Sequence, residues 1–455
     1  MKKYILTWVA ACTLLSGCGI YSKYKPASSV PENLYGEGVA TADTVGLGAT
    51  DWRELFTDPY LRTLIERGLC NNTDYLSAGL RVKEAEAALL SAKLAYLPSF
   101  ALAPQGVVSS FDGRKATQTY SIPVTASWEI DVFGKLRNAK RQSKALYAQS
   151  LDYKQAVRTQ VIAGVANTYY TLLMLDAQLE ISEQTRLSWK ETVDATRALM
   201  NAGLTDEAAV SQMEAAYYSV STSVLDLKEQ INRVENSMSL LLAEPPHTVE
   251  RGKLDSQNIP VGFSTGIPVL LLSNRPDVRA AERSLEQAFY ATNQARSAFY
   301  PSITLSGSAG WTNSAGGMIV NPGKFLASAV GSLTQPLFAR GQLTGQLKIA
   351  KAQQEEASLA FQQTLLRAGS EVNDALKQYQ TAREKSELYE KQVASLQTAY
   401  RSTSLLMRHG TTTYLEVLTA QQSLLTARLT QVANRTTEIQ GMISLYQALG
   451  GGCDE

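Results

Sequence analysis

The sequence is poor in the residues that build metal centres and catalytic sites. Only two of its 455 residues are histidines, His247 and His409, and its four cysteines include no Cys-x-x-Cys pair. These counts exclude a multi-histidine metal site. The sequence also has no Ser-His-Asp order and no phosphate-binding glycine loop followed by Lys-Ser/Thr. We therefore predict that the chain is not an enzyme and holds no metal or other noncovalent cofactor.

The chain also lacks a surplus of either charge and a long apolar run. Lysine and arginine number 43, against 42 for aspartate and glutamate, whereas nucleic-acid binding needs a large cationic surplus. We therefore predict no nucleic-acid partner. No segment offers the ~20 apolar residues that a membrane-spanning helix needs. If the mature chain crosses a membrane, it must do so with strands.

The first 17 residues predict a secretory signal peptide. Two lysines precede the mostly apolar segment 5–15, which is too short to span a bilayer as a helix. The following string LSGC ends at Cys18 and resembles the bacterial lipobox, in which this cysteine becomes the acylated first residue. A plain signal peptide with an incidental cysteine is the alternative. Gly19, in place of aspartate, permits sorting to the outer membrane, where acyl chains on Cys18 would anchor the chain.

The rest of the chain contains a tandem duplication of about 200 residues. Three pairs of strings occur in the same order in both halves, at offsets of 203, 205 and 207: AYLPSF at 95–100 with AFYPSI at 298–303, FGK at 133–135 with FAR at 338–340, and LMNAG at 199–203 with LMRHG at 406–410. The spacing drifts by only four residues. This period is far longer than that of solenoid repeats.

Each repeat begins with a helical stretch and continues with a strand pair. The helical stretches are expected at 72–97 and 276–300, with Asp74 and Asp277 as N-terminal caps. Apolar and polar side chains alternate along 118–133 and 301–313, and more weakly along 99–111 and 325–338. This period predicts strands, and the lengths suit a tilted membrane strand of ~9–11 residues, although a soluble sandwich strand has the same period. Four strands cannot close a barrel, so several chains would have to pool them.

Proline-free stretches complete each repeat. No proline lies between Pro123 and Pro245 or after Pro336, which predicts helices of ~65 residues, about 95 Å long. A heptad-like apolar seam runs along the first of them, formed by Val161, Val165, Thr168, Leu172, Leu175 and Leu179. Polar turns at 201–205 and 408–413 then return the chain into second helices ending near Ala243 and Leu449. Each repeat should therefore form a long antiparallel helical hairpin.

Four strings carry a resemblance to a known family. They are NRPDVRAAE at 274–282, AFYPSI at 298–303, WEIDVFGKLR at 128–137 and ALGGG at 448–452. In this order, in a duplicated chain, they resemble the TolC-like outer membrane efflux family, in its lipoprotein NodT/OprM-type branch. The resemblance runs from the lipobox to the C-terminus.

The resemblance implies an α+β membrane protein that is a homotrimer. Four transmembrane β-strands per chain would contribute to a 12-stranded β-barrel in the outer membrane, and the helical hairpins would form a periplasmic α-barrel. The implied domains are a signal peptide (1–17), a lipid-anchored extension with an equatorial segment (18–71), a first repeat (72–246), an equatorial linker (247–275) and a second repeat (276–455). The trimer would be an exit duct for drugs or other small solutes, with a periplasmic adaptor protein and an inner-membrane RND-type pump as partners.

The resemblance also points to the hairpin turns as the surface that docks the adaptor. It maps onto two short strings, Ala202, Gly203, Leu204 and Thr205 in the first turn and Gly410, Thr411, Thr412 and Thr413 in the second. Some relatives close this end with aspartates where this chain has threonines. Arg408 and Glu416 are therefore the candidate gate residues. Glycines that only end their helices through a positive φ are the alternative.

Several alternatives stay open at this point. Within the duct class, metal-ion efflux or type I secretion could replace drug efflux. From another class, a lipid-anchored periplasmic coiled-coil scaffold would use the helices but would have no need of alternating strands. Cys70 and Cys453 could form a disulfide in an oxidising periplasm or stay reduced.

Overall fold

The computed structural model describes residues 24–25, 50–110, 112–257, 275–315, 318–409 and 411–452. The predicted signal peptide, Cys18, Gly410 and Cys453 lie outside these residues. The described chain divides into two compact units. The sheet unit contains 80–151 and 280–363, and the hairpin unit contains 50–79, 152–257, 275–279 and 364–452. Among the described residues, no helix combines the length and the apolar character that crossing a membrane would require.

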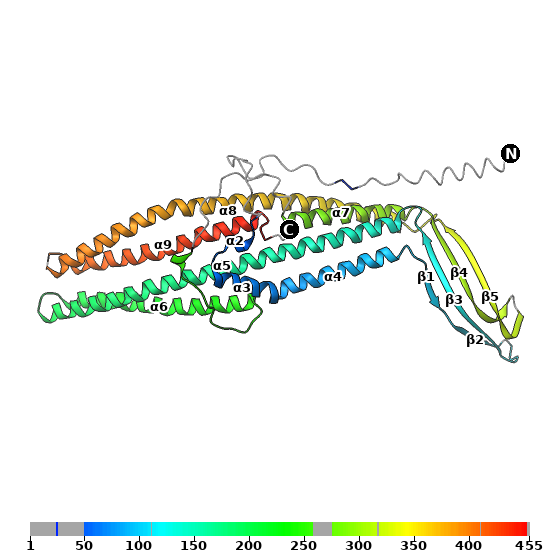
Figure 1. Ribbon diagram of the computed structural model, residues 1–455, viewed down its shortest axis with the longest axis horizontal. Helices are drawn as coiled ribbons and strands as arrows, with labels where there is room; N and C mark the ends of the chain where they lie inside the picture. Colours follow the sequence, from blue (N-terminus) through cyan, green and yellow to red (C-terminus); the bar gives the residue numbers. More distant parts are fainter. Residues whose placement is uncertain are drawn as a thin grey trace. The chain divides into compact units, whose positions relative to one another are not determined.

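The sheet unit is built around antiparallel strands (Figure 1). Its strands are β1 (Ser99–Leu102), β2 (Gln105–Ser109), β3 (Thr117–Ile130), β4 (Ser302–Ala315) and β5 (Met318–Thr334), and they pair in the order β1-β3-β4-β5, with β2 also paired to β3. The strand expected at 99–111 is therefore interrupted, because Pro104 has no N–H to donate to the ladder. The neighbouring Ala103 N–H still donates to the carbonyl of Pro123 at 3.0 Å. The sheet thus has four strand positions.

The last strand differs from its expected bounds. β5 begins at Met318 rather than near 325, and it ends at Thr334 rather than at 338. Its early start completes a hairpin with β4, in which Ala315 lies opposite Met318. It ends two residues before Pro336, whose ring restricts the backbone and cannot extend the ladder.

Register gives the sheet two chemically different faces. Across β3, β4 and β5, Ile122 lies beside Trp311 and Trp311 beside Phe325, so one face is apolar, and the Trp311 and Phe325 rings are 5.5 Å apart. The other face carries hydroxyls, and the Ser308 and Ser328 hydroxyl oxygens lie 2.8 Å apart. The predicted alternation is therefore real, and both faces are exposed in a single chain. On the apolar face Trp311 is 59% and Phe325 60% accessible, and on the hydroxyl face Ser328 and Ser332 are exposed.

The hairpin unit contains two long antiparallel helix pairs, α5 (Lys135–Asn201) with α6 (Glu207–Leu241), and α8 (Gln342–Arg408) with α9 (Tyr414–Ala448). The first parts of α5 and α8 belong to the sheet unit. In both pairs the helices have 67 and 35 residues. Two helices of the same length in each repeat are what the duplication predicts. The unit also holds α2 (Trp52–Leu55), α3 (Pro59–Asn71) and a short 3₁₀ turn, η3 (Leu254–Ser256).

The core of the hairpin unit lies where α3 packs on α5. Val161, Val165, Leu172 and Leu175 of the expected seam are buried, whereas Thr168 and Leu179 are only partly buried. Burial extends well beyond that seam, to a second set of α5 side chains: Ile162, Ala166, Tyr169 and Leu173. The expectation of a narrow seam was too restrictive, because α2, α3 and the linker after α6 contribute Trp52, Phe56, Leu61, Ile65, Val249 and Leu254 to the same cluster.

The two aspartates expected to cap helices lie inside their first turns instead. α4 (Thr73–Leu94) is capped by Asn72, whose side-chain oxygen accepts from the N–H groups of Asp74 and Tyr75, both at 3.0 Å. α7 begins at Pro276, so Asp277 is its second residue. Asp277 binds the guanidinium of Arg275 and the N–H of Val278. Both carboxylates still stabilise their helices, because a negative charge in the first turn interacts favourably with the positive end of the helix dipole.

Candidate functional site at the hairpin turns

The first turn ends α5 with a glycine in the left-handed conformation. Gly203 has φ +75°, and its N–H donates to the Met200 carbonyl at 2.9 Å. The N–H of Leu204 reaches back to the Leu199 carbonyl at 2.9 Å. These two bonds form a Schellman motif, which satisfies carbonyls at the end of the helix. Nothing lies within 4 Å of a Cβ built on Gly203, so the backbone is open to an approaching partner.

The same turn starts α6 with a side-chain cap. Asp206 lies before the helix with extended backbone, and its carboxylate accepts from the Ala209 N–H at 2.9 Å. Glu207 adds a second negative charge in the first turn of α6. This charge stabilises the helix, because it lies near the positive end of the helix dipole. Leu204 is 74% accessible at the crest of the turn. The first turn therefore presents a large exposed apolar side chain, Leu204, on a backbone whose hydrogen bonds are made to the ends of both helices.

The second turn repeats the first at an offset of 207 but is held differently. The Thr411 N–H donates to the Leu406 carbonyl at 3.0 Å, as Leu204 does to Leu199. Thr413 occupies the N-cap position of α9 and makes no side-chain cap bond. The hydroxyl of Thr412 donates instead to the Glu416 carboxylate. Glu416, expected as a gate residue, thus lies in the first turn of α9 and is engaged by its own turn.

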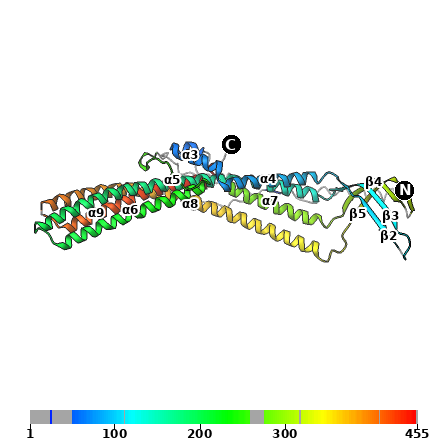
Figure 2. The same cartoon turned by 90° about the horizontal axis from the view of Figure 1, so that it is seen from below.

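The two turns lie at the same end of the hairpin unit (Figure 1 and Figure 2). A pocket of about 600 Å³ separates them. Its lining comes from both hairpins: Thr196, Leu199, Leu204, Thr205, Met407, His409, Thr412, Thr413 and Tyr414. Of the predicted residues, Leu204, Thr205, Thr412 and Thr413 are brought together here. Ala202, Gly203 and Thr411 lie in the turns without lining the pocket, and Arg408 is the last residue of α8.

Below the pocket, the hairpins are joined by an apolar cluster and a polar one. Trp189 and Met213 are buried together, with Tyr414 and Leu418 of α9 packed against them. Ser188, the residue before Trp189 in α5, accepts a hydrogen bond from the Gln421 amide at 3.1 Å and lies 3.0 Å from the Tyr400 hydroxyl. The pocket therefore has a packed floor.

Sequence reasoning missed several residues of this pocket. Thr196, Leu199, Met407 and Tyr414 lie in the helices on either side of the turns, where only packing shows which way a side chain points. Asp206 could have been found, since aspartate is among the preferred N-cap residues and a predicted helix follows it directly. His409 is exposed in the second turn, and it also lines the pocket.

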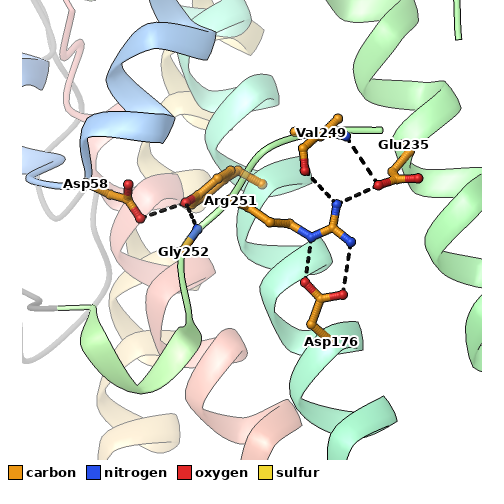
Figure 3. A network of polar contacts seen from close by, with 7 residues as sticks. Asp58, Asp176, Glu235, Val249, Arg251 and Gly252 are labelled. Atoms are coloured by element: carbon orange, nitrogen blue, oxygen red, sulfur yellow. Dashed lines mark hydrogen bonds and ion pairs between the residues drawn. The ribbon is translucent and has the colours of Figure 1, made fainter. Parts of the chain in front are cut away.

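At the other end of the first hairpin, an arginine fixes the linker that leaves α6 (Figure 3). The Arg251 guanidinium binds both oxygens of Asp176 on α5, at 2.5 and 3.0 Å, and Glu235 on α6 at 2.6 Å. It also donates to the Val249 carbonyl at 2.9 Å. The hydrogen bonds and charges of these carboxylates, that of Asp176 foremost, raise the pKa of Arg251 despite its burial. The guanidinium therefore stays charged and ties three segments together.

A second polar contact joins α3 to the same linker. The Tyr169 hydroxyl donates to Asp58 at 2.7 Å and accepts from the Gly252 N–H at 3.0 Å. Burial, followed by the bond to Asp58, raises the pKa of Tyr169, so the phenol keeps its proton. The Gln257 amide donates to the same carboxylate oxygen at 2.7 Å. Asp58 also caps α3 through the Tyr60 N–H.

The equivalent end of the second hairpin is tied by another arginine and by the C-terminal glycines. Arg275 binds Asp277 at 2.7 Å and Glu371 at 2.6 Å, and it donates to the Ala448 carbonyl at 2.9 Å. The Gly452 carbonyl accepts from the buried Arg158 at 2.5 Å. The ALGGG string at the end of α9 is therefore held against α5 by these hydrogen bonds.

The charged groups in the described part of the chain do not gather as metal ligands would. No group of three or more histidine, cysteine, aspartate or glutamate side chains in that part is arranged to hold a metal ion. Cys70 is exposed, and the pairing with Cys453 that the sequence left open cannot be followed, because Cys453 lies outside the described residues. The main features of the described chain are the pocket between the two hairpin turns, the arginine contacts at the other end of each hairpin, and a sheet with one apolar and one hydroxyl face.

Comparison with known proteins agrees with this arrangement. The family model described as "Outer membrane efflux protein" matches residues 64–244 and 267–451. The chain is 29% identical over 448 residues to the cation efflux system protein CusC of Escherichia coli strain K12, covering 96% of this chain and 97% of CusC. It is 26% identical over 466 residues to the antibiotic efflux pump outer membrane protein ArpC of Pseudomonas putida, covering 99% and 96%. The open-state crystal structure of the MtrE outer membrane channel of Neisseria gonorrhoeae superposes with a TM-score of 0.85 at 25% identity, covering 96% of this chain and 98% of MtrE.

Proposed function

This chain belongs to the outer membrane efflux protein family, and we propose that three copies of it form the outer-membrane exit duct of a tripartite efflux system. The observation that carries the proposal is the sheet of four strand positions with one apolar and one hydroxyl face, both exposed in a single chain. A strand that separates lipid from water needs this alternation. A scaffold of soluble coiled coils has no use for it.

The edges of the sheet support the trimer. β1 and β5 end the strand order, and unpaired strand edges are not tolerated in a bilayer. Pairing β5 of one copy with β1 and β2 of the next would satisfy both edges and close the wall around a water-filled bore. The hydroxyl face would then line the bore and the apolar face would contact lipid. Cys18, once acylated, would add a second attachment to the outer membrane.

The hairpins supply the periplasmic part of the duct. Four helices per chain, placed side by side in three copies, would enclose a tunnel that continues the bore. The turns at its end carry the pocket of about 600 Å³ between Leu204, Thr205, Thr412 and Thr413. We propose that a periplasmic adaptor protein docks there and connects the duct to an inner-membrane RND-type pump. Arg408 and Glu416 remain the proposed gate residues, with Glu416 acting through Thr412.

Drugs and other small solutes are the proposed cargo, and the pump rather than the duct selects among them. Metal ions are the second candidate, because CusC is named as a cation efflux protein. An antibiotic efflux protein covers the same length of chain at similar identity, so cargo does not follow from similarity alone. Type I secretion remains a further alternative.

The experiment is a substitution in the second turn. Replacing Gly410 with tryptophan should abolish efflux while heat-resistant trimers persist on gels, because a large side chain would block a partner's backbone. Substituting Gly345, which has nothing within 4 Å of a built Cβ and lies in α8, with alanine is the matched control and should leave efflux intact. Normal export of dyes, antibiotics and metal salts by the Gly410→Trp protein would refute adaptor docking at this turn. A stable monomer of the unaltered protein, free of detergent, would refute the duct itself.

A further inference from the structure

The β4–β5 hairpin carries a single charged side chain. Between Ser302 and Thr334 the sequence contains no aspartate, glutamate or arginine, and Lys324 is its only lysine. All other polar side chains in this stretch are serine, threonine or asparagine. Such a wall interacts weakly with either sign of ion. The sign of one fixed charge therefore decides which ions it favours.

Register places Lys324 on the hydroxyl face. Lys324 lies opposite Thr312, and two-residue steps along β5 lead from it to Leu326, Ser328, Val330 and Ser332 on the same face. The apolar face begins one residue later, at Phe325. A side chain four carbons long in this position extends from the hydroxyl face rather than toward lipid. Lys324 is exposed.

The backbone around Lys324 is fixed by polar contacts. The Gly323 N–H donates to the Tyr120 hydroxyl at 3.0 Å, and a Cβ on Gly323 would lie 2.5 Å from that oxygen. The Thr312 hydroxyl donates to the Tyr120 carbonyl at 2.9 Å. The Asn313 side chain accepts from the Tyr120 N–H at 2.7 Å and donates to the Gln118 carbonyl at 3.1 Å. These bonds hold the end of the sheet in one register, and with it the lysine.

The opposite end of the hydroxyl face is electrically balanced. Glu129 lies on the same face of β3, and the Lys135 ammonium binds it at 2.9 Å. Lys324 has no such carboxylate in its own hairpin. The neighbouring β2–β3 turn adds Arg114 and Lys115 against the single carboxylate of Asp112. The end of the sheet at which β2 connects to β3 and β4 connects to β5 therefore carries a net positive charge.

We propose that Lys324 sets the ion preference of the duct at its outer mouth, where three copies form a cationic ring that favours small anions over cations. The inference rests on the proposed trimeric duct. Fixed charge at a water-filled mouth raises the local concentration of counter-ions. Its reach is about one Debye length, ~10 Å at 0.1 M salt and ~30 Å at 0.01 M. The preference should therefore be strong in dilute salt and weak in concentrated salt.

The test is the reversal potential of purified trimers in planar lipid bilayers under a KCl gradient. In ~0.01 M salt, Lys324→Gln should raise the cation-to-anion permeability ratio about twofold, and Lys324→Glu should raise it further. Lys324→Arg keeps the charge and should match the unaltered protein. All four ratios should converge near 1 M salt, where the Debye length is ~3 Å.

A second measurement uses one protein and changes its charge in place. Lys324→Cys, in a background with Cys70 and Cys453 replaced by serine, is treated from the outer side with a cationic or an anionic thiol reagent. The cationic adduct should restore the anion preference and the anionic adduct should reverse it. Open channels whose permeability ratio is the same for lysine, glutamine and glutamate would overturn the role of Lys324 and leave the duct standing. Absence of any conductance from the unaltered trimer would overturn the proposed duct, and this inference with it.

Discussion

The two helical hairpins are repeats of one another, yet they are held in different ways. Both pair a 67-residue helix with one of 35 residues, and both end the long helix with the same backbone bond, Leu204 to Leu199 and Thr411 to Leu406. The first hairpin then has the Asp206 cap and the Arg251 anchor. The second has an uncapped Thr413 and an anchor, Arg275, whose carboxylates are half exposed. The two repeats therefore share the helical hairpin but differ in the cap and anchor contacts that hold it.

This difference indicates which hairpin can move at the lower cost in free energy. Opening the proposed gate requires helix ends to separate at the turns, and a helix whose first N–H groups lack a side-chain cap, as in α9, frays at lower cost. We therefore expect the second hairpin to be the mobile one and the first to serve as its support. Each of the following experiments removes one cap or anchor contact and compares the resulting loss of stability in the two hairpins.

The largest effect is expected from the anchors. Arg251 and Glu235 are 13% and 12% accessible, so Arg251→Ala would leave a carboxylate buried without its partner, and the free energy of unfolding should fall by about 3–5 kcal/mol. Asp277 and Glu371 are 45% and 47% accessible and can be rehydrated, so Arg275→Ala should cost only about 1–2 kcal/mol. Thermal unfolding of the purified trimers measures both.

The ion pair of Arg53 with Glu66, at 3.4 Å and about half exposed on both sides, provides a control for the anchor experiment. Arg53→Ala should change stability by less than about 1 kcal/mol. Equal losses for Arg251→Ala and Arg275→Ala would mean that the two hairpins are anchored alike, against the comparison drawn here.

The caps should give a smaller effect. Asp206→Ala removes the bond to the Ala209 N–H and should destabilise the start of α6 by about 1 kcal/mol. Thr413→Ala removes no such bond and should change α9 little, whereas Thr413→Asp should slow its fraying. Hydrogen exchange of the first turns of α6 and α9 reports both effects separately. Faster exchange in α6 than in α9 of the unaltered protein would reverse the assignment of the mobile hairpin.

The smallest effect is a dependence of stability on pH in the second hairpin. Burial raises the pKa of Asp277, but the hydrogen bond and charge of Arg275 outweigh it, so the pKa lies below its usual value. Its stabilising contribution is therefore complete above the unfolded pKa of about 3.9 and is lost as pH falls through the lower folded value. Melting temperatures measured from pH 5 downward should fall less steeply for Asp277→Asn than for the unaltered protein. An unchanged slope would contradict this contribution.

Much of the fold could be predicted because its signals are local and repeated. The α5 helix has 67 residues, close to the expected length, and it ends at Asn201, where the predicted turn begins. A proline-free stretch and a glycine turn account for both. The alternation along β3 and β4 fixed their faces as well, because side chains on a strand alternate by geometry. Where the local signal was ambiguous, prediction failed. Asn72 and Asp74 are both good capping residues, and Asn72 caps α4.

The hairpin turns were only half predictable. Position in the repeat identified Gly203 and Thr411 to Thr413, since a turn between two helices needs residues that stop a helix. The pocket between them joins residues about 200 positions apart in the chain, such as Leu204 and Thr412. No period in the sequence encodes that distance. Its walls at Met407 and Tyr414 appear only once the helices are packed.

By itself, the sequence determined the elements of this protein: two long hairpins with their turns, and four strand positions with two faces. These follow from backbone sterics and hydrophobic period, which act over a few residues. Only the tertiary structure decided which elements hold one another. The contacts of Arg251 with Asp176, of Arg275 with Glu371 and of Gly452 with Arg158 join segments 75 to 294 residues apart. Such pairs depend on how whole helices pack, and that is a property of the folded chain.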